Sequence, residues 1–424
     1  MTDWAPILEG AERDETYDSI QSVLAGLADP AFGTEQLGPG VAGGNLGLAL
    51  LFDEAHRVLG PVDPLLAQRD ARWNSAIDGL SNSSGIQPNL FTGYCGIGWA
   101  TAFLGGPGND EVHEELELAL LDDLEHFADP VDYDLINGVV GWGLYALERW
   151  PHQRAARALE LIVDFLDARA ERIASGVRWH TSPEILVRWQ RESYPHGYFN
   201  LGLAHGIPGI VVFLAQVAER GIRTDVIPPL LEGAIDWILS NRIEHAPDLA
   251  FPSFAVEGLE PSPSRLAWCY GDLGITVSLF LAARCTGHDG WERQARALAR
   301  TLAEIPVERT RVRDAGLCHG AAGVAHVFNR MFHWTGDEVL KDVSRRWFGR
   351  TLQLRVPGEG PGGYPAWGAH GPDNQFRQVW RPCAGLLEGS CGVALAQLAA
   401  ISDCEPRWDR FLFISPVPVA RVHS

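Results

Sequence analysis

Seven apolar stretches of helical length recur along the chain, and each follows a Gly-x-x-Gly tetrapeptide. Behind Gly323, for example, the apolar residues Val324, Val327, Phe328 and Met331 lie three and four positions apart, which makes one buried helical face. Most runs behind the other glycines are apolar on nearly all sides, as helices packed on several sides must be. The tetrapeptides are Gly44–Gly47, Gly93–Gly96, Gly138–Gly141, Gly206–Gly209, Gly271–Gly274, Gly320–Gly323 and Gly389–Gly392. This repetition predicts seven inner helices with one kind of entrance.

Stretches of a second kind alternate with these runs. Residues Ala155–Ile173 and Trp291–Ile305 place apolar and charged residues on opposite faces, as surface helices do. One amphipathic and one apolar helix per repeat predict an all-α fold, an α/α toroid of seven inner and seven outer helices, as a single domain over residues 1–424. About 60 residues per repeat would hold two helices of roughly 12 residues and their loops. The glycines suit close backbone approach and positive φ at each crowded helix entrance.

Two regions break the repeat. Residues 175–200 show short alternation of the strand type and no helical period, which predicts a small β-containing insertion between the third and fourth repeats. Residues 355–385 are rich in glycine, proline and aromatic residues, and they form a stretch too long for a simple connector. We interpret this second region as a loop that covers a site or contacts a peptide, with a surface loop of no function as the alternative.

Composition limits the function. With 46% hydrophobic and 21% charged residues, the chain can bury a substantial core and is not disordered. The net charge of −20 disfavours nucleic acid and anionic membranes as partners. The sequence shows neither a secretion signal nor an apolar stretch of about 18 residues, so we expect no membrane insertion and a cytoplasmic location. Seven widely spaced cysteines favour free thiols or a metal site over disulfides.

Reactive residues occupy matching positions in neighbouring repeats. The two residues before the first glycine of a turn include Cys269 in the fifth repeat, Cys318 and His319 in the sixth, and His205 in the fourth. Asp134 lies four residues before the first glycine of the third repeat. Because these positions precede equivalent inner helices, we expect their side chains to meet at one end of the toroid.

Two cysteines and one histidine from adjacent repeats suit Zn²⁺, which accepts thiolate and imidazole ligands in tetrahedral geometry. Three protein ligands, Cys269, Cys318 and His319, would leave the fourth position open, as in catalytic zinc sites. A Cys-x-x-Cys motif is absent from the sequence, which argues against a structural zinc finger. The alternative is that Cys318 and His319 are ordinary core residues.

Charge indicates which reaction such a site supports. Zinc with two thiolate ligands is formally neutral and a weak Lewis acid, but it still deprotonates a bound thiol near neutral pH. The site therefore suits attack of a thiolate on an electrophilic alkene, a Michael addition whose enolate needs a proton. His205 is the candidate donor. Arg265 could stabilise the enolate and Asp134 could orient His205, with a buried histidine and a structural ion pair as the alternatives.

These motifs together resemble the lanthipeptide cyclase (LanC) family. The resemblance is carried by Arg265–Gly271 (RLAWCYG), Leu317–Gly320 (LCHG), Ala204–Gly209 (AHGIPG) and Asp134–Gly138 (DLING), and the glycine framework extends it over nearly the whole chain. It implies zinc held by Cys269, Cys318 and His319, and an acid–base His205 surrounded by Asp134, Arg265 and Tyr270. It also implies closure of lanthionine or methyllanthionine thioether rings, by addition of peptide cysteines to dehydroalanine or dehydrobutyrine during lanthipeptide antibiotic biosynthesis.

The resemblance further implies two partners, a dehydrated precursor peptide with a leader and a separate dehydratase. The chain has no room for a fused dehydratase, so it resembles the stand-alone type. Three other functions stay open. A LanC-like enzyme would add glutathione to dehydrated residues with the same zinc and histidine, a zinc-thiolate prenyltransferase would need an aspartate ligand and an aromatic funnel, and a non-catalytic scaffold would bind peptide only.

Overall fold

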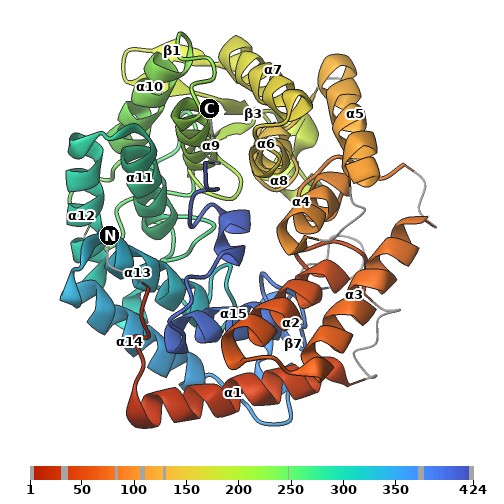
Figure 1. Cartoon of the computed structure of the whole chain (residues 1–424). Helices are drawn as coiled ribbons and strands as arrows, with labels where there is room; N and C mark the ends of the chain where they lie inside the picture. The colour runs from red at the N-terminus through yellow and green to blue at the C-terminus, as the bar shows by residue number, and fades with distance from the viewer. Residues whose placement is uncertain are drawn as a thin grey trace. The chain divides into compact units, whose positions relative to one another are not determined.

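The structure is a computed structural model that describes residues 4–29, 37–81, 85–105, 110–127, 130–246, 248–370 and 377–419. It is mostly helical, and Figure 1 labels the helices and colours them from the N-terminus (red) to the C-terminus (blue). The chain divides into two compact units. The first lies within Met1–Ile86, Leu266–Trp268 and Ala303–Trp408, and the second lies within Gln87–Arg265, Cys269–Leu302 and Asp409–Ser424.

The first unit contains three of the predicted inner helices. They are α2 (Asn45–Leu59), α13 (Ala321–Thr335) and α15 (Ser390–Ile401), accompanied by the outer helices α1 (Gly10–Ala28), α3 (Asp63–Ser81) and α14 (Glu338–Gln353). Helix α15 packs between α2 and α13, while α3 packs on α2, α14 on α13, and α1 on α15. Every residue of α15 is buried, because neighbours surround this helix on all sides.

The second unit contains the other four inner helices, α4 (Tyr94–Leu104), α6 (Val139–Glu148), α9 (Ile207–Glu219) and α11 (Asp272–Thr286). Their outer partners are α5 (Asp110–His126), α7 (Gln153–Arg169), α10 (Ile227–Ser240) and α12 (Asp289–Ala303). The inner helices pack in chain order, α4 on α6, α6 on α9 and α9 on α11. Outside these two sets of repeats, the described residues also form the short helices η4 (Val307–Arg309) and η6 (Trp408–Leu412).

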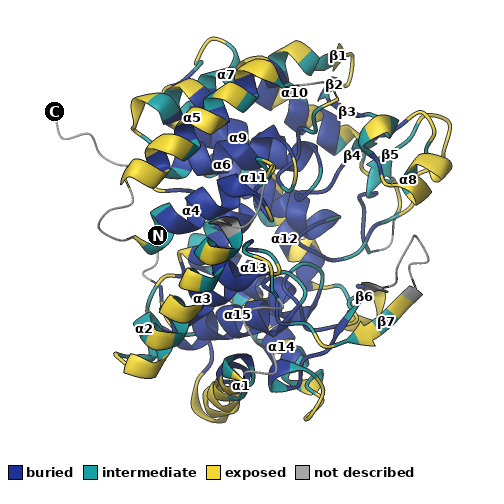
Figure 2. Cartoon of the chain, turned by 90° about the vertical axis from the view of Figure 1, so that its right-hand side faces the viewer, coloured by how far each residue is buried: buried dark blue, intermediate teal, exposed yellow. Residues whose placement is uncertain are grey.

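Burial follows the predicted division between inner and outer helices. In the second unit, α4, α6 and α9 are buried along most of their length, whereas α5 and α7 turn exposed faces outward (Figure 2). Helix α7 buries Ala155, Ala158, Leu159, Ile162 and Val163, three and four positions apart, as an amphipathic helix does. The apolar inner helices are therefore stabilised mainly by tertiary packing.

Most glycines of the entrances are explained by a close backbone contact. A Cβ on Gly138 would lie 2.4 Å from the carbonyl oxygen of Asp132, and a Cβ on Gly141 would lie 2.2 Å from that of Leu135. In each case the oxygen belongs to the residue six positions earlier. The Val139 N–H donates to the Asp132 carbonyl at 3.1 Å, so the loop itself caps the helix and no side-chain cap is needed. The same clash would occur at Gly44, Gly47, Gly93, Gly206, Gly209, Gly271, Gly323, Gly389 and Gly392.

The predicted close approach at the helix entrances is thus confirmed, but the predicted positive φ is mostly wrong. Among the seven first glycines only Gly271 has a positive φ, of 88°. The other first glycines are extended, for example Gly138 with a φ of −100°. Contact with the preceding loop, rather than backbone conformation, excludes a side chain at these positions.

Backbone hydrogen bonds join the entrance loops of neighbouring repeats. In the second unit the Leu90 N–H donates to Ile136, Leu135 donates to Ala204, and Ala204 donates to Cys269, at 3.2–3.3 Å. Each accepting carbonyl belongs to the residue two positions before a first glycine. In the first unit the matching bonds run from Cys318 to Leu387 and from Leu386 to Ala42, both at 2.8 Å. Within each unit, this ladder holds equivalent positions of neighbouring repeats in register.

The strands expected within residues 175–200 are present, with two differences. Helix α7 ends at Arg169 rather than at Ile173, since Glu171–Ile173 (β1) pairs with Gly176–Arg178 (β2). The region also contains a six-residue helix, α8 (Arg188–Ser193), which the sequence did not indicate, and the turn η3 (Pro183–Ile185). A three-stranded sheet joins β3 (His180–Thr181), β4 (Tyr198–Asn200) and β5 (Phe254–Ala255).

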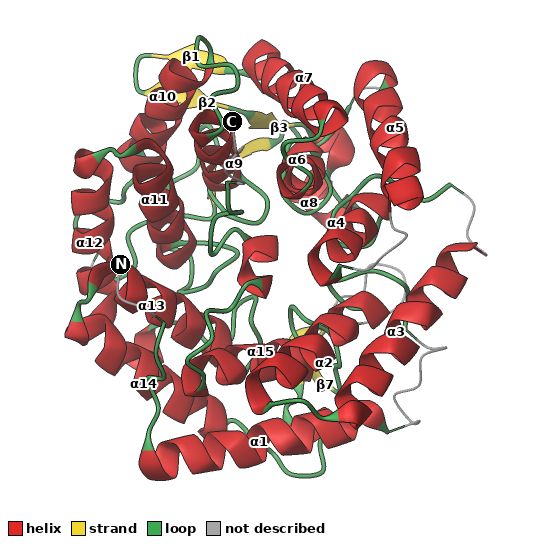
Figure 3. Cartoon of the chain, in the orientation of Figure 1, coloured by secondary structure: helices red, strands yellow, loops and turns green. Residues whose placement is uncertain are grey.

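The stretch 355–385 contains regular structure. Its described residues form η5 (Pro361–Gly363) and an antiparallel pair of strands, β6 (Ala366–His370) and β7 (Arg377–Arg381), and β7 is drawn as a strand in Figure 3. Residues 371–376, part of the predicted loop, lie outside the described residues. Among the described helices, none combines the length and the apolar character needed to cross a membrane.

We expect Gly392→Ala to lower the free energy of unfolding by more than about 2 kcal/mol, because its Cβ would lie 2.0 Å from the Leu386 carbonyl oxygen. Gly349→Ala is the matched control, since a Cβ there meets nothing within 4 Å and alanine favours the helix by up to about 1 kcal/mol. Chemical denaturation measures both variants, and equal stability of Gly392→Ala and the natural protein would contradict the contact.

Candidate metal and acid–base site

His205 and Asp134 form an ion pair at the entrances of α9 and α6. The His205 Nδ1 donates to Asp134 Oδ2 at 2.5 Å. The other oxygen of Asp134 accepts the N–H groups of Asn137 at 2.6 Å and Gly138 at 2.9 Å, so the entrance loop fixes the carboxylate. The Asp134 side chain is 2% exposed and that of His205 is 37% exposed. The loop therefore holds the Asp134 carboxylate against His205, and part of the histidine ring stays accessible.

The charges around His205 favour its protonated form. Burial disfavours the imidazolium, but the negative charge and the hydrogen bond of Asp134 outweigh burial and raise the pKa of His205. Burial and the charge of Asp134 raise the pKa of the neighbouring Asp132 to about 8. Asp132 Oδ1 accepts the Asp134 N–H at 3.2 Å, so this second acidic side chain supports the backbone that carries the first. His205 can thus hold a proton near neutral pH.

Tyr270 lies against His205. The two rings stack with centroids 6.1 Å apart and 23° between their planes. The Tyr270 hydroxyl accepts a hydrogen bond from Asn200 Nδ2 at 3.3 Å, and burial raises the pKa of Tyr270, so its hydroxyl stays protonated. A Cβ on Gly202 would lie 2.7 Å from the Tyr270 ring, which explains the glycine there. The tyrosine limits the space beside the histidine.

Arg265 lies four residues before Cys269 in the loop that leads into α11, and its side chain is half-buried. Its carbonyl oxygen lies against Gly271, where a Cβ would be 2.3 Å away. Its guanidinium forms no ion pair with the residues that the structure describes. A cation without a carboxylate partner is suited to an anionic ligand, but the predicted role of Arg265 towards an enolate stays a prediction.

Cys269, Cys318 and His319 form the group of possible metal ligands found among the described residues. Each offers one ligand atom, the Sγ of the two cysteines and a ring nitrogen of the histidine, and these atoms lie within 4.8 Å of one another. Cys269 is buried, and the other two are half-buried. Two thiols and one imidazole are the donor types that Zn²⁺ prefers, so the residues fit that ion.

Sequence reasoning missed Asp314 and Asn200, which support the neighbouring loops. Asp314 Oδ2 accepts the N–H of Trp367 on β6 at 2.9 Å, and Asp314 Oδ1 accepts the Gly316 N–H at 3.3 Å. Burial raises the pKa of Asp314, while the nearby ring of His319 opposes this shift. Asn200 and Asp314, like Asp132, lie six residues before a first glycine, so the repeat register could have identified both.

Comparison with known proteins gives consistent matches. A family model described as lanthionine synthetase C-like protein matches residues 35–413. The chain is 23% identical to the nisin biosynthesis protein NisC of Lactococcus lactis subsp. lactis over 269 residues, 58% of this chain and 63% of that protein. It is 27% identical to the glutathione S-transferase LANCL1 of Danio rerio over 158 residues, 36% of this chain and 34% of that protein. Both matches thus span less than two thirds of the relative's length.

The solved structure of a nisin cyclase superimposes on 95% of this chain and 96% of its own chain, with a TM-score of 0.71 and 20% identity. This similarity concerns the fold. Together with the inner and outer helices found here, it confirms the predicted α/α toroid. The predicted division into one domain and the predicted roles of the site residues stay predictions.

We expect Asp134→Asn to lower the pKa of His205, because the neutral amide removes the charge that stabilises the imidazolium. Histidine NMR titration, assigned with His205→Ala, measures the shift. Asp123→Asn is the control, since Asp123 accepts a hydrogen bond from Tyr94 instead and its loss should leave the His205 titration unchanged. An unchanged pKa of His205 in Asp134→Asn would exclude electrostatic coupling between the two residues.

Proposed function

Because the chain belongs to the lanthionine synthetase C-like family, we propose that it is a zinc-dependent lanthipeptide cyclase. The reaction adds cysteine thiolates of a precursor peptide to dehydroalanine or dehydrobutyrine residues of the same peptide, and it closes thioether rings. The observation that carries the proposal is the group of Cys269, Cys318 and His319, whose ligand atoms lie within 4.8 Å of one another.

The ligand set supports a particular task for the metal. Two cysteines and one histidine leave one position of a tetrahedral zinc site for a substrate atom. Zinc bound by these residues would hold the incoming peptide cysteine as a thiolate near neutral pH. Since the two protein thiolates already balance the charge of the ion, the arrangement favours thiolate delivery over activation of a carbonyl group.

His205 supplies the proton that the addition requires. When the thiolate sulfur forms its bond to the β-carbon, the electron pair of the alkene moves towards the α-carbon and carbonyl group. The His205 Nδ1 is engaged by Asp134, so Nε2 is the ring atom that can donate a proton to the α-carbon. Asp134 positions the ring and favours its charged form, and Tyr270 stacks beside it. Arg265 is assigned to the enolate oxygen, as a cation would stabilise it.

Several further features belong to this proposal. The substrate is a dehydrated precursor peptide with a leader, and a separate dehydratase prepares it. The reaction takes place in the cytoplasm as part of antibiotic biosynthesis. The match to a protein named for nisin biosynthesis supports a peptide substrate of this kind.

Addition of glutathione to dehydrated residues is the second candidate function, favoured by the partial match to a glutathione S-transferase. The same ligands and the same histidine would serve it. Incubation of a dehydrated peptide with the protein, with and without glutathione, separates the two functions. Ring closure leaves the peptide mass unchanged and protects its cysteines from alkylation, whereas transfer adds the mass of glutathione.

We expect purified protein to contain about one zinc ion per chain and Cys318→Ala to lose it, because two remaining ligands hold zinc weakly. Metal analysis by mass spectrometry measures the content. Cys404→Ala is the control, because this half-buried cysteine lies outside the ligand group and should leave the zinc content unchanged. Full zinc retention in Cys318→Ala would show that the ligand assignment is wrong.

We expect His205→Ala to retain zinc but to cyclise a dehydrated precursor about 10²–10⁴ times more slowly, the usual loss for a missing proton donor. Thiol alkylation followed by mass spectrometry measures the free cysteines over time. His126→Ala, a change at an exposed residue of α5, is the control and should cyclise at the natural rate. Unaltered product formation by His205→Ala would remove its assigned role.

A further inference from the structure

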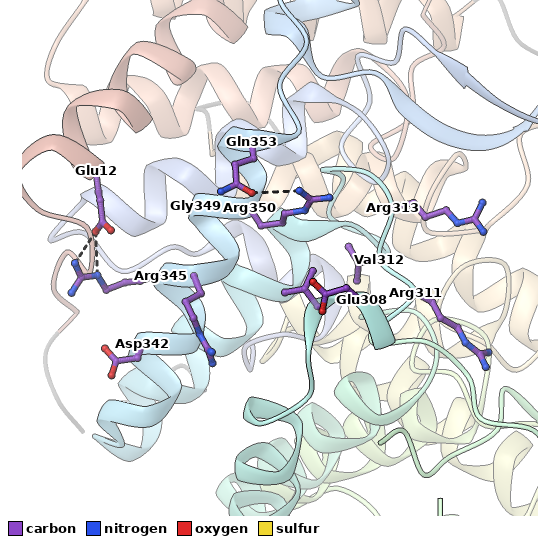
Figure 4. Close-up of a pocket in the computed structure, with 12 residues that line it drawn as sticks. Glu12, Glu308, Arg311, Val312, Arg313, Asp342, Arg345, Gly349, Arg350 and Gln353 are labelled. Carbon is purple, nitrogen blue, oxygen red and sulfur yellow. Dashed lines mark hydrogen bonds and ion pairs between the residues drawn. The ribbon is translucent and has the colours of Figure 1, made fainter. Parts of the chain in front are cut away.

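A groove in the first unit is lined by five arginines, and we call it the arginine groove. It has a volume of about 1170 Å³ and lies between α14 and the segment that follows η4. Arg345 and Arg350 come from α14, and Arg311 and Arg313 come from the segment (Figure 4). Arg346 of α14 also lines the groove. The chain as a whole has a net charge of −20, so a concentration of arginines in one groove favours a negatively charged ligand there.

Three of these arginines have no carboxylate partner among the described residues. Arg313 lies over the Trp367 ring at 5.5 Å, Arg346 donates to the Ala303 carbonyl oxygen at 3.1 Å, and Arg350 donates to the Gln353 side chain at 3.4 Å. A guanidinium has five N–H donors, so each keeps donors for a ligand. The groove therefore offers several charge-assisted hydrogen bonds to carboxylates.

The remaining charges of the groove limit the ligand. Arg345 is already paired with Glu12 on α1 at 2.7 Å, as Figure 4 shows. Glu308 and Asp342 also line the groove. Acidic residues among the arginines, in a strongly acidic protein, disfavour a continuous polyanion such as nucleic acid. Separated carboxylates, as on a peptide, can avoid these side chains.

The groove continues past the Glu12–Arg345 pair. A second hollow of about 360 Å³ shares Glu12, Arg345, Gly349 and Gln353 with the first. The rest of its wall consists of Leu8, Glu15, Thr16, Phe348 and Leu352. A ligand that follows both hollows would be longer than a single small anion. The two hollows together therefore suit an extended peptide segment with acidic side chains.

One wall of the arginine groove leads directly, along the chain, into the loop that carries Cys318 and His319. Arg313 is followed directly by Asp314, and the loop runs on to Cys318 and His319 at the entrance of α13. Five residue steps from Arg313 to Cys318 cover at most roughly 18 Å in a fully extended chain. A peptide held in the groove would thus need only a short linker to present a cysteine beside these ligands.

We propose that the arginine groove binds an acidic segment of the peptide substrate, outside the residues that form the rings. The inference rests on the proposed function for the identity of the peptide. Binding in the groove would raise the local concentration of the reacting segment near the site, so it would act on the KM of cyclisation and leave the kcat unchanged.

A binding experiment with the full-length protein tests the groove directly. The probe is a fluorescein-labelled synthetic peptide of aspartate, leucine and glycine, and its anisotropy is titrated with protein at low salt. We expect Arg350→Glu and Arg346→Glu each to weaken binding by at least about tenfold, because each reverses the charge of a donor. Glu308→Gln should tighten binding, since it removes a repelling carboxylate from the groove.

Three controls accompany this titration. Arg293→Glu makes the same charge change at an exposed position of α12, outside the groove, and should bind the probe as the natural protein does. A probe with lysine in place of aspartate should not bind. Unchanged binding by Arg346→Glu and Arg350→Glu, both with normal thermal unfolding, would overturn the proposal, and so would equal displacement of the probe by inorganic phosphate at matched ionic strength.

Cyclisation kinetics separate this proposal from the proposed function. If the protein cyclises dehydrated precursor, the expected effect of Arg350→Glu is a KM about tenfold higher with an unchanged kcat. A KM unaffected by the variant would overturn the groove as a substrate site while ring formation stands. Absence of cyclisation by the natural protein, with arginine-dependent binding of the probe, would instead reject the proposed function and with it the identity of the peptide.

Discussion

The contact between a glycine and the carbonyl oxygen six residues earlier is the constraint on which this fold depends. At Gly138 and Gly141 it lets the loop fold back over the first turn of α6, and the loop carbonyls then accept the N–H groups that begin the helix. Most entrances of the inner helices share this arrangement, so residues at equal offsets from the glycines adopt equal positions. A side chain at either glycine would push the loop away and remove the cap.

The candidate site is a consequence of that arrangement. Because Ala204 donates to the Cys269 carbonyl in the second unit and Cys318 donates to that of Leu387 in the first, the residues just before the glycines keep a fixed register between neighbouring repeats within each unit. The chemistry uses these positions directly. Asp134 has two roles, since one oxygen accepts N–H groups of its own loop and the other accepts a hydrogen bond from His205. The same carboxylate therefore stabilises the loop and contacts the candidate proton donor.

The seven inner helices could be predicted from the sequence because a glycine pair and an apolar run mark each entrance. The proximity of His205 and Asp134 could be predicted because both lie just before the glycines of neighbouring repeats. The sequence placed the end of α7 at Ile173 instead of Arg169, because pairing of β1 with β2 is a contact that helical periodicity does not express. It missed the supporting role of Asp314, whose partner Trp367 lies on β6. The arginine groove combines Glu12 with residues 307–353, a tertiary arrangement that local patterns do not contain.

The central claim is that Cys269, Cys318 and His319 hold one zinc ion with a position open to a substrate thiol. X-ray absorption spectroscopy at the zinc edge of the purified protein tests it most directly. Two sulfur ligands at about 2.3 Å and one histidine nitrogen at about 2.0–2.1 Å are predicted, with a third sulfur when a cysteine-containing substrate peptide is added. A zinc shell without two sulfur atoms, or one unchanged by the peptide thiol, would contradict the claim.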